Sequence, residues 1–161
     1  MDKNKPSESF QYGIKGIKMI SFSVNEDLYN DESIPLKVQF RYRFTYDLEN
    51  EILKFVFGTI YYTDELTVNK PVVSIDVEND FYIENLKDRT NGDIVTLPDP
   101  MWVTLVSLSI THTRSILAIM LAATKFKDRL IPIINPLDVA KAFFPDIVRN
   151  MELAAQSIEG E

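Results

Sequence analysis

Between Leu36 and Tyr46 the chain reads LKVQFRYRFTY, in which every second side chain is large and apolar. Side chains on a β-strand alternate between the two faces of a sheet, so the apolar ones share one face and the polar ones share the other. A strand with one dry face and one wet face is typical of an antiparallel sheet covered on a single side. The stretch therefore predicts an antiparallel sheet whose aromatic face, from Phe40 to Tyr46, packs under helices.

Three further segments have the composition of strands, being rich in Ile, Val and Phe. The polar turn 47–51 joins the second and third strands in a hairpin, and polar connections at 25–33 and 63–70 separate the others. The expected strands are residues 11–24, 36–46, 52–62 and 71–83.

The rest of the chain is expected to contain a long connection and two helices. Residues 84–100 lose the alternation and contain Gly and Pro, so we expect a long crossover there. Residues 101–125 are rich in Leu and Ala and are predicted to form one long helix, although 106–111 alternate like a strand. The fold class is therefore α+β: a four-stranded antiparallel sheet, a long crossover loop and two helices packed on one face.

The start of the last helix has a clear local signal. Asn135 is suited to cap a helix and Pro136 to occupy its first position, with Asp138 in the first turn. Pro145 is expected to kink this helix or divide it into two pieces, because a proline removes a backbone donor.

Composition limits the class of protein. The chain has 161 residues, 45% hydrophobic and 25% charged, which suits a single domain spanning 1–161 with a polar tail, 1–10, expected to be flexible. Its net charge of -7 disfavours a nucleic-acid partner, which would call for a surplus of Lys and Arg. The start of the chain lacks the apolar core of a signal peptide, and polar residues interrupt 101–123, so we expect no membrane insertion and a cytoplasmic location.

No pattern of catalytic or metal-ligating residues is apparent. The chain has no cysteine, and His112 is its only histidine. The acidic pairs Asp64/Glu65, Glu78/Asp80 and Asp27/Asp31 lie in or beside polar loops, where solvated charge explains them. A Gly-rich phosphate loop and a nucleophile elbow are both absent from the sequence. We therefore expect a protein that is not an enzyme and uses no cofactor and no metal.

Several residues resemble the pattern of the SecB family of export chaperones. The first strand contains Ile20-Ser21-Phe22, like the Ile-Ser-Phe of that family. An Arg in the long helix, a Phe after it, and an apolar-Pro-apolar segment ending in Asn before the last helix are similar to the family pattern. Here these are Arg114, Phe126 and the segment 131–135, followed by Asp138.

The resemblance implies an ATP-independent holdase that binds unfolded or preprotein chains through apolar grooves, and a role in protein export. It implies a homotetramer, a dimer of dimers with helix 101–125 between the dimers, and a surface facing the SecA motor to which Asp76 and Glu78 would belong. Candidate client-binding residues lie on the crossover and the last helix; for each one taken singly, ordinary core is the favoured alternative. They are Phe81, Tyr82, Ile83, Leu86, Leu97, Trp102, Phe143, Phe144, Ile147 and Met151.

Two other functions remain open at this stage. SecB-like chaperones also accompany some toxin–antitoxin systems, so the chain could be a dedicated adaptor or antitoxin-associated chaperone for a single client. A carrier of a hydrophobic small molecule, held between sheet and helices, is the other alternative.

Overall fold

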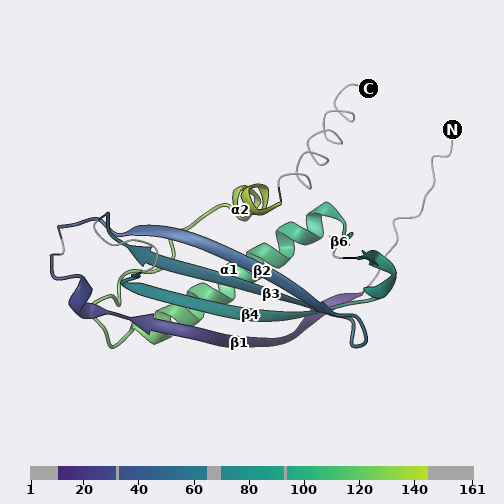
Figure 1. Cartoon of the computed structure of the whole chain (residues 1–161), viewed down its shortest axis with the longest axis horizontal. Coiled ribbons are helices and arrows are strands. Elements are labelled where there is room, and N and C mark those ends of the chain that lie inside the picture. The colour runs from purple at the N-terminus through teal and green to yellow at the C-terminus, as the bar shows by residue number, and fades with distance from the viewer. Residues whose placement is uncertain (1–10, 32, 65–69, 93, 145–161) are drawn as a thin grey trace, which may run out of the picture.

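The computed structural model describes residues 11–31, 33–64, 70–92 and 94–144, and its main element is one four-stranded antiparallel sheet (Figure 1). The strands are β1 (Tyr12–Val24), β2 (Lys37–Asp47), β3 (Ile52–Tyr62) and β4 (Val73–Ile83). Their order across the sheet is β1-β4-β3-β2, so β1 and β2 are the edge strands. The expected sheet is confirmed.

The two faces of the sheet differ as the alternation predicts. Along β4, buried side chains on the helix-facing side alternate with half-buried ones on the outer side. On β2 the aromatic face meets the helices, and the ring centroids of Phe44 and Trp102 lie 5.8 Å apart. Tyr42, on the same face, is still 37% exposed. Antiparallel pairing is continuous along β2 and β3, whereas β1 shifts its register against β4 between Ile14 and Gly16 and between Met19 and Ser21.

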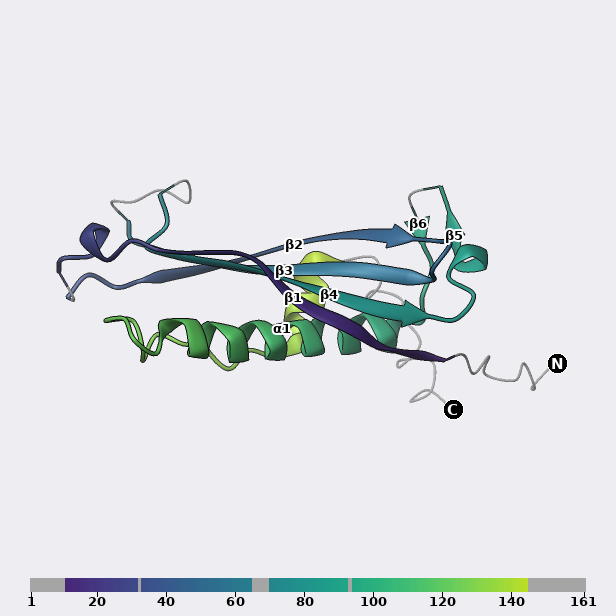
Figure 2. The ribbon, with the colours of Figure 1, turned by 90° about the horizontal axis from the view of Figure 1, so that it is seen from below.

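Helices α1 (Asp99–Leu121) and α2 (Pro136–Phe143) cover one face of the sheet and leave the other face open (Figure 2). The prediction that the long helix continues to Lys125 is wrong, because it ends at Leu121. Beyond this point Lys125 turns away and donates through Nζ to the carbonyls of Glu26 (2.5 Å) and Tyr29 (2.6 Å). Phe126 is buried in the core. The chain therefore leaves the helix where Lys125 binds these carbonyls and Phe126 enters the core.

The crossover is more ordered than the sequence indicates. It contains a 3-10 turn, η2 (Lys87–Arg89), and a short ladder of β5 (Thr90–Asn91) with β6 (Ile94–Val95). Strands this short have no periodicity to detect. Another 3-10 turn, η1 (Glu26–Leu28), lies in the connection after β1.

The core between sheet and helices has two hydrophobic parts. One gathers around Phe55, Phe81 and the first half of α1, and the other around Ile75, Leu117 and Phe126. Polar side chains on the middle of α1 and on the facing strands lie at the same interface, and the buried ones are Asn79, Thr59, Ser109 and Thr113. Asn79 donates to the carbonyls of Phe55 and Val77, at 3.3 Å each, which compensates part of the cost of burying its amide.

Candidate functional site

The segment that leads into α2 is fastened to α1 by one arginine. Arg114 donates through Nε to the carbonyl of Ile131 (3.1 Å) and through Nη2 to that of Pro132 (2.5 Å). Asn135 then caps α2 by accepting from the backbone N–H of Leu137 (3.0 Å), as the sequence predicts. Two residues of this segment project into solvent, Ile133 at 96% and Leu130 at 44% exposure. The position of α2 therefore depends on contacts made by Arg114.

Two largely apolar hollows lie on either side of the start of α2. A hollow of about 300 Å³ separates α1 from the first residues of α2, and one of about 380 Å³ lies between α2 and β2. Both are bordered by Asn135. The smaller is lined by Val103, Thr104, Ser107, Leu108, Asn135, Pro136 and Leu137. The larger is lined by Phe40, Ile134, Asn135, Asp138, Val139, Ala142 and Phe143.

Aromatic rings hold the end of α2 against β2. The ring of Phe143 stacks on that of Tyr42 at 4.1 Å, and the Tyr42 hydroxyl donates to the Phe143 carbonyl at 2.7 Å. Phe144 lies 4.8 Å from the ring of Trp102. Both phenylalanines are half-buried against the core. Phe143 also lines the larger hollow, so it forms part of the wall of that hollow while also stabilising the fold.

Five of the residues expected to bind a client are buried in the core, which corrects their assignment to a groove on this chain. Their exposed fractions are 6% or less, because α1 and the crossover pack them against the sheet. They are Phe81, Ile83, Leu86, Leu97 and Trp102. The alternative reading of these side chains as ordinary core therefore holds for this structure.

The remaining residues expected to bind a client lie in different parts of the structure. Tyr82 lies on the outer face of β4, with the Lys15 amine 5.2 Å from its ring centroid, so it cannot share a groove with Phe81 and Ile83. Period-two alternation alone separates these neighbours. Phe143 lines the larger hollow and Phe144 packs against Trp102, whereas Ile147 and Met151, like the expected break at Pro145, lie outside the described residues.

An apolar row on β1 that the helices leave uncovered was not predicted from the sequence. These side chains face the helix side of the sheet but lie beyond the cover that α1 provides. Their exposed fractions run from 37% to 50%, and they belong to Tyr12, Ile14, Ile17 and Met19. The composition of β1 contained the signal, but only the strand order puts β1 at the edge.

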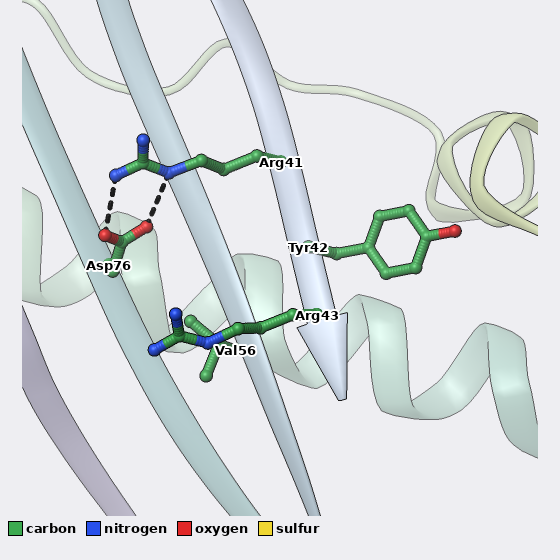
Figure 3. A pocket seen from close by; sticks show the side chains of 5 residues that line it. All are labelled: Arg41, Tyr42, Arg43, Val56 and Asp76. Carbon is green, nitrogen blue, oxygen red and sulfur yellow. Dashed lines mark hydrogen bonds and ion pairs between the residues drawn. The ribbon is translucent and has the colours of Figure 1, made fainter. Parts of the chain in front are cut away.

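The outer face of the sheet is not a simple acidic surface (Figure 3). Asp76 accepts from Arg41 Nε (2.8 Å) and Nη2 (2.6 Å) and from the Ser21 hydroxyl (2.7 Å). Burial raises the pKa of Asp76, but these hydrogen bonds and the charges of Arg41 and Arg43 outweigh it and keep that pKa below its usual value. Glu78 is half-buried and lies next to Lys18 in the register. A SecA-facing surface that includes Asp76 and Glu78 stays a prediction.

His112 is held within the fold by a side-chain contact with Asn79. Its Nδ1 lies 2.7 Å from Asn79 Oδ1, and since the Asn79 amide nitrogen already donates, Nδ1 is the donor in this contact. Burial lowers the pKa of His112. Within the described part of the chain, no group of three or more His, Asp or Glu side chains is placed to hold a metal ion.

Helix α1 is long and apolar enough, over Pro100–Leu121, to cross a membrane by length and composition. The same test is passed by the core helix of a soluble protein. Here α1 supplies Leu105, Val106 and Leu117 to the core, and 33% of its apolar window is buried.

No protein-family model and no curated protein sequence matches the chain. Among solved structures, it is similar to a SecB-like chaperone from Mycobacterium tuberculosis in complex with a ChAD peptide from the HigA1 antitoxin. The TM-score is 0.45 at 7% sequence identity, and the match covers 76% of this chain and 83% of that chain. A similarity of this size transfers neither a function nor a partner to this chain.

Proposed function

We propose that this protein is an ATP-independent chaperone that holds non-native polypeptide on apolar surface beside α2. The observation that carries the proposal is the pair of hollows that flank the start of α2, about 300 and 380 Å³ in volume. A cavity of roughly 150 Å³ already holds benzene, so each hollow has room for a large apolar side chain of a client. Burial would then be the driving force for binding.

The size of this driving force favours an oligomer. Fully burying one large apolar side chain contributes about 1.5–3 kcal/mol, so two filled hollows contribute roughly 3–6 kcal/mol before the cost of ordering the client. Micromolar binding needs about 8 kcal/mol. One chain is therefore a weak binder, and several chains holding the same client would add their contacts through effective concentration.

A homo-oligomer, in the arrangement of a dimer of dimers, is accordingly part of the proposal. What supports it is the edge strand β1, which presents Tyr12, Ile14, Ile17 and Met19 partly uncovered. Sedimentation velocity across a range of concentrations checks this part. A monomer at every concentration would remove the oligomer from the proposal.

The decisive test of holding is aggregation of two unrelated, chemically unfolded proteins on dilution, with and without near-stoichiometric amounts of this protein. Ala142 is exposed and lines the larger hollow, so Ala142→Glu places a charge there without touching the core. Ala123 is also exposed and lies in the turn after α1, so Ala123→Glu is the matched control. We expect suppression by the wild type and by Ala123→Glu, and clearly weaker suppression by Ala142→Glu.

The same assay separates the alternatives. Protection of only one of several clients would favour a dedicated or antitoxin-associated chaperone, and no protection of any would refute the holdase. Co-purified lipid without protection would favour a hydrophobic carrier. A lipid site between sheet and helices is disfavoured because Phe55, Phe57 and Phe81 already fill that interface, each 1% exposed or less.

A further inference from the structure

A second candidate binding site lies on the outer face of the sheet, opposite the helices and the hollows. It is a pocket of about 290 Å³ lined by Arg41, Tyr42, Arg43, Val56 and Asp76. The side chains of Arg41 and Arg43 extend in the same direction from β2 across β3 (Figure 3). Val56, the β3 residue in register with Arg43, also lines the pocket and is only 6% exposed.

The two arginines have different surroundings because different residues of β3 lie in their paths. Arg41 is in register with Gly58, which is in register with Asp76. A Cβ on Gly58 would lie 2.2 Å from Asp76 Oδ1 and 2.7 Å from Arg41 Cγ, so the glycine is what lets Arg41 lie flat and reach Asp76. That contact neutralises Arg41 and holds it in place as one wall of the pocket.

Arg43 lacks an equivalent partner. It is in register with Val56, and Val56 with Glu78, but here the valine side chain stands where the glycine left space. Arg43 is exposed and makes no ion pair or side-chain hydrogen bond with any residue in the described ranges. The pocket therefore keeps the charge of one guanidinium, in a chain whose net charge is -7.

The geometry points to a carboxylate of an acidic polypeptide segment as the ligand of this pocket, bound by the guanidinium of Arg43. A guanidinium offers a planar fork of N–H donors that fits a carboxylate with two parallel hydrogen bonds. One remaining positive charge suits a monoanion, whereas a phosphate dianion would leave excess negative charge next to Asp76. Arg41 uses Nε and Nη2 on Asp76, so the guanidinium of Arg43 is the one left to bind the ligand.

A polypeptide suits the pocket better than a free carboxylate ion. An exposed guanidinium–carboxylate pair is weak by itself, so useful binding needs a second contact. Lys54 lies on the same face of β3 as Val56, two residues away, and makes no ion pair with the described residues. That spacing is about 6.8 Å along a strand, which matches alternate side chains of an extended peptide. The ligand class is therefore an extended segment with acidic residues at alternate positions.

The test uses peptides without apolar side chains, so that the hollows beside α2 do not contribute. Fluorescence anisotropy compares a labelled peptide GSESESESG with its counterpart GSQSQSQSG at about 20 mM salt, where screening is weak. The variant is Arg43→Gln. The control is Lys18→Gln, which removes an exposed cation from the same face outside the pocket. We expect binding of the glutamate peptide alone, at least tenfold weaker for Arg43→Gln and changed less than twofold for Lys18→Gln.

Four results would overturn the inference. They are equal binding of both peptides, equal losses for Arg43→Gln and Lys18→Gln, no binding of the glutamate peptide, and stronger displacement by inorganic phosphate than by acetate at equal concentration. Because Arg43 lies away from α2, Arg43→Gln should protect unfolded proteins as the wild type does. Failure of this site and failure of the holdase are thus separate outcomes.

Discussion

Replacing Arg114 by Met should loosen α2 while leaving the sheet intact. Methionine retains much of the length and apolar packing of the arginine stem, so the change removes mainly the two hydrogen bonds to the carbonyls of Ile131 and Pro132. A hydrogen bond from a charged donor contributes about 1.5–3 kcal/mol. The bond to Pro132 is exposed and that to Ile131 partly buried, so we count chiefly the latter and expect a loss of about 2 kcal/mol.

Urea denaturation gives the free energy of unfolding, and a loss of this size should lower the Tm by about 4–8 °C for a chain of this length. Hydrogen exchange of peptides covering 131–144 reports the local effect and should be faster in the variant. Arg129→Met is the matched control, because Arg129 is exposed in the same connection. If Arg114→Met and Arg129→Met are equally stable and exchange equally fast over 131–144, the argument that Arg114 positions α2 is refuted.

Three further predictions concern single contacts. Because burial lowers the pKa of His112, the unfolded chain binds a proton more readily than the folded one as pH falls below about 6.5. The free energy of unfolding should therefore decline below that pH. Urea denaturation from pH 8 to 5 measures this decline, and His112→Gln should make it less steep. Lys125→Met removes two donated hydrogen bonds and should lower the free energy of unfolding by about 1–2 kcal/mol. Lys127→Met changes an exposed neighbour and is the control. Equal Tm values for the two variants would contradict this prediction. Phe144→Ser opens the contact with Trp102 and should cost roughly 2–4 kcal/mol, seen as a lower Tm, whereas an unchanged Tm with weaker client holding would mean that Phe144 serves the surface alone.

The pairing of Asp76 with Arg41 bears on the expected SecA contact. An acidic docking surface needs carboxylates free to meet a basic partner, but Asp76 already accepts three hydrogen bonds from Arg41 and Ser21. Arg43 adds positive charge beside it. Asp76 is therefore not free to meet a basic partner, and the expected SecA contact through Asp76 and Glu78 stays a prediction.

Much of the local structure could be predicted because it depends on residues close together in the chain. Alternation places Phe44 and Phe55 on the covered face, and Asn135 with Pro136 starts α2 through contacts within one turn. The end of α1 was predicted less well, since Lys125 leaves the helical path for partners almost a hundred positions away in the chain.

The sequence by itself determined the α+β class, the strands and their two faces, and the cap of α2, because hydrophobic period and capping act over a few residues. Only the tertiary structure decided the strand order, which leaves β1 at an edge with its apolar row uncovered. It also decided that Trp102 is core and that Arg41, but not Arg43, finds a carboxylate across β3. Burial and ion pairing across a sheet depend on which strands become neighbours, and that choice is made by packing of the whole chain.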